Sequence, residues 1–267
     1  MAVRIAVFGA GGKMGHAIVR AIAEAKGAVL SAAVERSEFP YLSADVSQLA
    51  GLPPSGLRLT DQRPGKDAAD VWVDFSAPAA TLANVQAAAA CGVAMVVGTT
   101  GLSAADKERI ATAAKSIPLV LAPNMSVGMN AMLKLVAEAA RILGPSYDPE
   151  IVETHHRAKR DAPSGTALRL AEAVAEATGR NLDKTARYAR HGDIGPRTDG
   201  EIGIQTLRGG DVFGDHTVLF LGQGDRIEIT HRASSRDTFA RGAVRAALWL
   251  AGKPAGFYDM RDVLGLK

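Results

Sequence analysis

The 267-residue sequence contains little cysteine, few aromatic residues and little net charge. Its one cysteine, Cys91, excludes an intramolecular disulfide and is typical of a reducing compartment. Aromatic residues make up only 5% of the chain and do not alternate with lysine or arginine runs, which argues against nucleic-acid binding. The uncharged stretch 75–105 contains Pro78, several glycines and polar residues, which excludes a membrane span. With no signal-peptide pattern at the N-terminus, these absences predict a cytoplasmic protein.

Glycine, in contrast, is abundant, with 28 residues, which indicates tight turns or close approaches of backbone to ligands. The net charge of +3 comes from scattered basic residues. This distribution favours a local basic pocket for a small acidic substrate over an extended binding surface.

Short apolar segments alternate with helical segments through the first half of the chain. Segments 4–8, 29–34, 71–73, 93–97 and 118–121 have the pattern of buried strands. Their alternation with helices predicts an α/β fold, a Rossmann-like, doubly wound, mostly parallel sheet. Because a glycine-rich or polar turn follows each strand, we expect ligands at the carboxyl ends of the strands.

The pattern changes after Ser126. A long helix at 127–143, a strand at 150–154 and a helix from Gly165 to Gly179 precede three strand-like runs between 202 and 230. This order predicts a smaller α+β domain with a mixed sheet.

The first strand leads directly into G-x-x-G-x-x-G on Gly9, Gly12 and Gly15, in place of the strict dinucleotide motif G-x-G-x-x-G. Backbone N–H groups at a helix start can approach a pyrophosphate only where no Cβ obstructs them. Glu35, at the end of the second strand, has the spacing to bind an adenosine ribose hydroxyl, and Arg36 could pair with a 2′-phosphate. The segment therefore predicts binding of NADH and NADPH rather than a simple tight turn.

Segment 155–166 contains the richest group of chemically active residues. His155, His156 and Lys159 follow a strand and supply proton donors and acceptors near neutral pH. Ser164–Thr166 begins a helix whose N–H groups and dipole would hold a carboxylate. No metal site is predicted, because adjacent histidines on a strand point to opposite faces. The plainer alternative is a solvated basic loop before an ordinary serine-capped helix.

Over essentially its whole length the sequence resembles the dihydrodipicolinate reductase family, also called 4-hydroxy-tetrahydrodipicolinate reductases. The His-His-x-x-Lys run followed by Ser-Gly-Thr is the most specific mark. The other marks are Gly9–Gly15, Asp74–Pro78, Gly98–Gly101, Ala122–Gly128, Arg208–Asp211 and Ser235–Ala240. The resemblance implies reduction of 4-hydroxy-tetrahydrodipicolinate to tetrahydrodipicolinate by NADH or NADPH, with release of water, in lysine and diaminopimelate biosynthesis.

The resemblance also implies roles for individual residues. His155 and Lys159 would be the acid–base pair, with Lys159 as the proton donor. The dicarboxylate substrate would be bound by His156, Ser164, Gly165 and Thr166. The cofactor would be bound by Gly9, Ala10, Gly11, Gly12, Lys13, Met14, Glu35, Arg36, Gly98, Thr99, Thr100, Ala122, Pro123, Asn124 and Met125.

The family pattern implies two domains and a homotetramer assembled through the sheet of the smaller domain. Residues 1–126 with 236–267 would form the dinucleotide-binding domain, and residues 127–235 the substrate-binding and oligomerisation domain. Two other functions stay open: another two-domain NAD(P)-dependent dehydrogenase of a small amino or keto acid, and a non-enzymatic dinucleotide-sensing protein.

Overall fold

The computed structural model describes residues 1–266 and contains two compact units. Met1–Val127 and the chain from Arg236 onward form unit 1, and Gly128–Ser235 form unit 2. Within the described residues, no helix is both long enough and apolar enough to cross a bilayer.

Unit 1 contains a six-stranded sheet in the order β11-β5-β4-β3-β1-β2. Every strand pair is parallel, which confirms the predicted doubly wound sheet. Because the chain passes from β1 to β2 on one side and returns to β3 on the other, the order reverses at β1 and β3. The strands are β1 (Val3–Phe8), β2 (Ala28–Val34), β3 (Val71–Asp74), β4 (Ala94–Val97), β5 (Pro118–Leu121) and β11 (Gly256–Tyr258).

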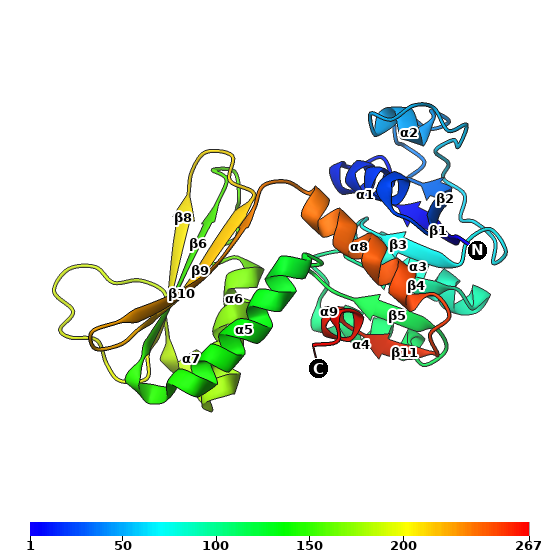
Figure 1. Cartoon of the computed structure of the whole chain (residues 1–267). Coiled ribbons are helices and arrows are strands. Elements are labelled where there is room, and N and C mark those ends of the chain that lie inside the picture. Colours follow the sequence, from blue (N-terminus) through cyan, green and yellow to red (C-terminus); the bar gives the residue numbers. More distant parts are fainter. Residues whose placement is uncertain (267) are drawn as a thin grey trace. The chain divides into compact units, whose positions relative to one another are not determined.

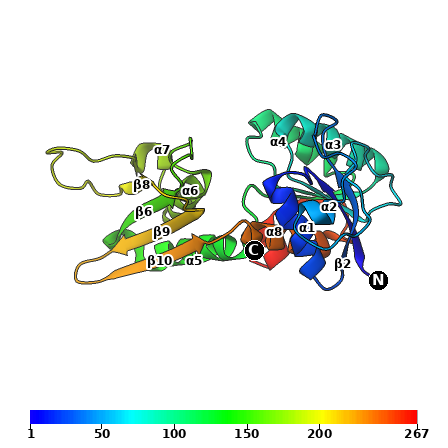
Figure 2. The same ribbon diagram turned by 90° about the horizontal axis from the view of Figure 1, so that it is seen from above.

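Helices cover both faces of this sheet, so its central strands are apolar throughout rather than alternating. α1 (Lys13–Glu24) and α8 (Asp237–Leu250) lie on one face, and α3 (Pro78–Cys91) and α4 (Ala104–Ala113) on the other, as Figures 1 and 2 show. The short helices α2 (Val46–Leu49) and α9 (Met260–Leu264) complete the unit.

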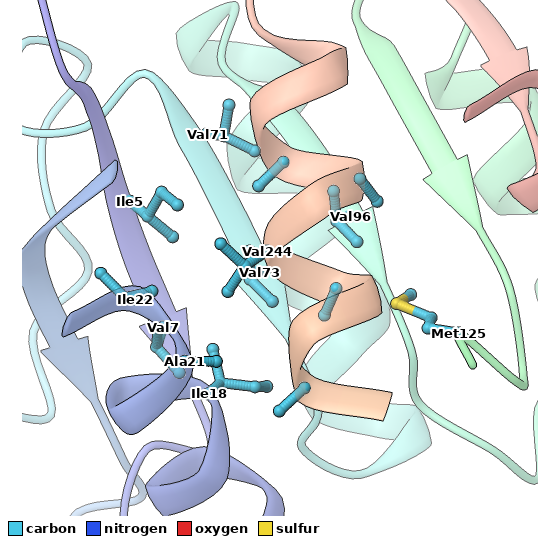
Figure 3. Close-up of a cluster of buried hydrophobic side chains, with 14 of the residues drawn as sticks. Ile5, Val7, Ile18, Ala21, Ile22, Val71, Val73, Val96, Met125 and Val244 are labelled. Carbon is cyan, nitrogen blue, oxygen red and sulfur yellow. The ribbon is translucent and has the colours of Figure 1, made fainter. Parts of the chain in front are cut away.

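Two hydrophobic clusters result, one on each face of the sheet. Figure 3 shows the first, in which Ile18 and Ile22 of α1 and Val244 of α8 approach Val7 of β1 and Val73 of β3. The C-terminal helix α8 therefore contributes to the core of the N-terminal unit, although more than a hundred residues of chain separate it from β5.

Unit 2 contains a five-stranded mixed sheet in the order β10-β9-β6-β8-β7. The β10–β9 and β9–β6 pairs are antiparallel, whereas the β6–β8 and β8–β7 pairs are parallel, which confirms the predicted mixed sheet. The strands are β6 (Asp148–His155), β7 (Ala186–Arg187), β8 (Ile202–Arg208), β9 (Gly214–Leu221) and β10 (Arg226–Ala233).

One face of this sheet is covered by helices and is apolar. Burial along β6 alternates strictly, so Ile151, Glu153 and His155 lie on the covered face. Ile151 and Phe220 pack there against side chains of α5 (Val127–Leu143) and α6 (Gly165–Thr178). The segments η1 (Gly144–Ser146) and α7 (Leu182–Thr185) follow these two helices.

Candidate active site

The glycine loop connects β1 to α1 in a tight turn. Gly9 has a φ of +75°, and a Cβ there would lie 2.7 Å from the carbonyl oxygen of Phe75. A Cβ on Gly15 would lie 2.2 Å from the carbonyl oxygen of Gly9, so these two positions require glycine for packing. Gly12, the N-cap of α1, is exposed, and a Cβ there would meet only the Gly9 carbonyl oxygen, at 3.3 Å. The N–H of Gly12 donates to the Gly9 carbonyl at 3.1 Å, so Gly12 offers a ligand an uncrowded surface without a Cβ rather than a free N–H.

Glu35 lies against the glycine loop. Its carboxylate accepts hydrogen bonds from the N–H groups of Gly11, at 3.0 Å, and Arg36, at 3.1 Å. The Arg36 side chain is exposed. The ring of Phe39 covers Gly11, where a Cβ would lie 2.5 Å from a ring carbon. Sequence reasoning missed Phe39, because nothing in the order of residues places this loop aromatic over the turn.

A buried carboxylate organises the next two turns. Asp74, at the end of β3, is fully buried and accepts hydrogen bonds from the hydroxyls of Ser76 (2.6 Å) and Thr99 (3.2 Å). Thr81 and Asn84 of α3 also donate to this carboxylate, at 3.1 and 2.8 Å. Asp74 therefore connects the turn after β3 to the turn after β4, which contains predicted cofactor residues Gly98, Thr99 and Thr100.

The remaining predicted cofactor residues follow β5. The N–H of Ala122 donates to the carbonyl of Val97 at 3.0 Å. The Asn124 side chain accepts from the N–H of Ser126 at 3.0 Å, and Met125 is buried against Gly242 of α8. The turns after β1, β2, β4 and β5 thus lie at the carboxyl edge of the sheet, where α/β sheets bind ligands.

In unit 2, Glu153 is the centre of a buried polar cluster. Its side chain is fully buried, and one oxygen lies 2.5 Å from Nδ1 of His155. Arg208 of β8 donates to both carboxylate oxygens, at 2.8 and 2.9 Å. The N–H of Ser164 donates to the same carboxylate at 3.0 Å. Each of these donors stabilises the charged form of the carboxylate beside His155.

Ser164 is buried, and its hydroxyl makes contacts within the fold. Its oxygen accepts the N–H of Ala167, which caps α6, and lies 3.1 Å from Nε2 of His216. Gly165, the first residue of α6, is exposed, and no described atom lies within 4 Å of the Cβ position that it lacks. An anion approaching α6 would therefore reach the helix start at Gly165 more readily than the Ser164 hydroxyl.

Lys159 and His156 lie in the loop that follows β6. The Lys159 ammonium forms an ion pair of 2.9 Å with Asp161, and its side chain is 21% exposed, so solvent reaches it. This partner lowers the pKa of the Asp161 carboxyl. His156 is half-buried, and its backbone N–H donates to the carbonyl of Val212 at 2.8 Å. The structure thus brings two histidines, a lysine and a helix start together within one unit.

The two residues at the centre of this cluster were missed from the sequence. Glu153 and Arg208 were not among the predicted site residues, although a glutamate on the buried face of an alternating strand was a detectable signal.

No group of three or more histidine, cysteine or acidic residues suited to a metal occurs within residues 1–266.

Comparisons with known proteins match the whole chain. The family model described as "Dihydrodipicolinate reductase, N-terminus" matches residues 3–125, and "Dihydrodipicolinate reductase, C-terminus" matches residues 128–264. The 4-hydroxy-tetrahydrodipicolinate reductase of Anaeromyxobacter dehalogenans strain 2CP-1 is 54% identical over 99% of this chain and 98% of its own. The enzyme of the same name from Syntrophotalea carbinolica is 52% identical over 99% of this chain and 100% of its own.

Solved structures agree at the level of the fold. A dihydrodipicolinate reductase from Paenisporosarcina sp. TG-14, with dipicolinate bound, superposes with a TM-score of 0.73 at 22% identity, covering 97% of this chain and 98% of its own. GenD2 from gentamicin A biosynthesis, in complex with NAD, gives a TM-score of 0.61 at 16% identity, covering 95% of this chain and 88% of its own.

Proposed function

The chain belongs to the dihydrodipicolinate reductase family and reduces 4-hydroxy-tetrahydrodipicolinate with NADH or NADPH, and we propose that His155 and Lys159 are its acid–base pair. The reaction belongs to lysine and diaminopimelate biosynthesis, yields tetrahydrodipicolinate and releases water. Family membership favours this activity over the two alternatives, another dehydrogenase or a dinucleotide sensor. The observation that supports the residue assignment is that the Glu153 carboxylate contacts both Nδ1 of His155 and the Ser164 N–H at the start of α6, in the unit that also contains Lys159.

Unit 1 would bind the dinucleotide. The cofactor supplies the hydride when it is bound. The uncrowded surface at Gly12 and the start of α1 suit a pyrophosphate, because the first turn of the helix presents N–H groups and a positive dipole end. Glu35 already lies against this loop and would accept from a ribose hydroxyl, whereas the exposed Arg36 would meet a 2′-phosphate. Because Glu35 would contact a free ribose hydroxyl and Arg36 a 2′-phosphate, the two residues together support the use of both NADH and NADPH.

The remaining cofactor residues would line the nicotinamide side. Gly98, Thr99 and Thr100 form the turn that Asp74 holds, and Ala122–Met125 forms the next turn at the same edge of the sheet. Thr99 uses its hydroxyl inside the fold, so its backbone and the exposed Thr100 are the groups offered to a ligand.

Unit 2 would bind the small dicarboxylate substrate. Each carboxylate needs a cationic or N–H-rich partner. The start of α6 at Gly165 and Thr166 provides one such partner, and Lys159 with His156 provides the other. Ser164 would serve this site by capping α6, because its hydroxyl already accepts the Ala167 N–H.

The proposal is tested by following NADH and NADPH oxidation with freshly generated 4-hydroxy-tetrahydrodipicolinate. We expect Lys159→Met to lower kcat by about 10²- to 10⁴-fold, the usual contribution of one general acid. Lys134→Met is the matched control, because Lys134 is an exposed lysine of the same unit that pairs with Glu138. Full activity in Lys159→Met would remove this lysine from the mechanism.

We also propose that the enzyme is a cytoplasmic homotetramer assembled through the uncovered face of the unit 2 sheet. The exposure of Leu207 on β8 (49%) supports this, because Leu207 lies opposite Thr154 on the face turned away from the helices, and a partner would bury its large apolar side chain. Sedimentation velocity tests the assembly: Leu207→Glu should shift the tetramer toward smaller species. A wild-type monomer would contradict it.

A further inference from the structure

The carboxylate of Glu153 faces His155 across the buried side of β6. The two residues are separated by one position in the strand, so their side chains leave the same face. Oε2 of Glu153 lies 2.5 Å from Nδ1 of His155. Arg208, at 2.8 Å from Oε2 and 2.9 Å from Oε1, closes the carboxylate from the other side.

The hydrogen bonds keep Glu153 ionised despite its burial. Burial disfavours the charged carboxylate, but hydrogen bonds from Arg208, His155 and the Ser164 N–H more than compensate and leave the pKa of Glu153 below its usual value. An ionised carboxylate can only accept hydrogen bonds. Nδ1 of His155 must therefore carry a proton, and in the neutral imidazole Nε2 is left as the acceptor.

The charged groups around His155 act on its pKa in opposite directions. Burial lowers this pKa, Glu153 raises it, and Lys159 and Arg208 lower it further, with a net lowering. The ring of His216 packs edge-on at a centroid distance of 5.1 Å. Glu153 is thus the one neighbour among these groups that stabilises a proton on His155.

Nε2 of His155 lies beside the backbone of β9. A Cβ on Gly214 would be 2.9 Å from this nitrogen, so any other residue there would place a carbon against it. The glycine keeps this side of the ring uncrowded, while Glu153 holds the opposite nitrogen.

We propose that Glu153 is a positioning residue of this reductase: held by Arg208, it fixes His155 as the Nδ1–H tautomer and directs Nε2 toward the reaction. The inference rests on the proposed role of His155 in the acid–base pair. It differs from a purely structural role for Glu153, in which the tautomer of His155 would not depend on the carboxylate.

The test uses Glu153→Gln in the full-length enzyme. Arg208 and the Ser164 N–H can only donate, so the Gln oxygen should take the Oε1 position, which accepts from both, and the Gln amide nitrogen should take the Oε2 position beside His155. Nδ1 would then have to accept, which moves the proton to Nε2. We expect ¹⁵N NMR of the histidine side chains to show the Nδ1–H form of His155 in the wild type and the Nε2–H form in the variant. His155→Gln assigns the signal.

The kinetic readout separates positioning from folding. With Glu153→Gln we expect kcat to fall by about 10- to 100-fold, by analogy with the loss of the carboxylate partner of a metal-binding histidine. KM for NADPH should stay within about twofold, and the pKa of His155 in the NMR titration should fall because its stabilising carboxylate is gone.

Glu150→Gln is the matched control. Glu150 lies on the same strand, on the opposite face, and its carboxylate is also paired with arginine, at 2.8 Å from Arg190. This variant should leave the His155 tautomer and kcat unchanged.

The inference is overturned if wild-type His155 is in the Nε2–H form, a result that needs no variant to fold. It is also overturned if Glu153→Gln folds and keeps both the tautomer and kcat. Failure of the proposed function looks different: wild-type enzyme would not oxidise NADPH with the substrate, while the NMR signal would still report the Glu153–His155 contact.

Discussion

His216 on β9 should make the free energy of unfolding depend on pH, and replacing this one residue should remove that part of the dependence. The residue is 4% exposed, its Nε2 lies 3.1 Å from the Ser164 hydroxyl, and its Nδ1 has no hydrogen-bond partner among residues 1–266. Burial, reinforced by the nearby charge of His155, lowers the pKa of His216 to about 3. The folded protein therefore keeps this imidazole neutral.

The size of the effect follows from the difference between the two pKa values. The unfolded chain binds a proton at His216 below its ordinary pKa of 6.5, and the folded protein does so only near 3. Stability from this site is therefore complete above pH 6.5 and is lost as the pH falls toward 3. Since one pKa unit corresponds to 1.36 kcal/mol, the free energy of unfolding should decrease by about 2 kcal/mol from pH 8 to pH 5 through this residue alone.

Urea unfolding at pH 8 and pH 5, followed by circular dichroism, measures this decrease. His216→Gln has no titrating ring but keeps an amide that can donate to Ser164. We expect it to lose about 2 kcal/mol less than the wild type between the two pH values, whatever its absolute stability. The exposed His191→Gln is the control and should follow the wild type. Equal pH dependence in wild type and His216→Gln would refute the reasoning.

Three further substitutions test the packing around the cofactor turns. Gly12→Ala should weaken NADPH binding by calorimetry while leaving the melting temperature within a few degrees, because Gly12 is exposed and an added Cβ meets only the Gly9 carbonyl oxygen within 4 Å; a large loss of stability would contradict the assignment of Gly12 as an uncrowded surface. Asp74→Asn should cost about 1–3 kcal/mol in urea unfolding and raise the Kd for NADPH, since its amide nitrogen would replace the oxygen that accepts from the Asn84 amide; unchanged Kd would show that the turns hold without the carboxylate. Gly242→Ala should lower the free energy of unfolding by about 1–3 kcal/mol, because its Cβ would lie 1.8 Å from the Met125 carbonyl oxygen. Gly209→Ala is the control: its Cβ would meet nothing within 4 Å among the described atoms, so the same unfolding assay should show no change.

Local pattern predicted much of the fold. Strands such as Val71–Asp74 are short apolar runs bounded by turn residues, and helices such as Asp237–Leu250 have a continuous apolar face. The strand Gly256–Tyr258 was missed because a run of three residues that follows a proline is too short to show an alternation of apolar and polar side chains. Its pairing with Pro118–Val120 comes from the tertiary fold, which local propensity does not contain.

The proposed catalytic residues could be picked out for a similar reason, because His155 and Lys159 are close together in sequence. Several of the side chains around these residues lie far away in sequence, and strand register brings them together. In the sheet of unit 2, Glu153 lies opposite Thr206 of β8 on one side and His216 of β9 on the other. The same register places Arg208 opposite His155.

No spacing rule within one sequence gives that register. The only local sign was that Glu153 shares the buried face of β6 with Ile151, where an unpaired carboxylate would be strongly destabilising. A carboxylate buried at such a position needs a hydrogen-bonding or cationic partner. The partner found, Arg208, donates to both oxygens and still leaves Oε2 able to accept from His155, and burial strengthens that contact.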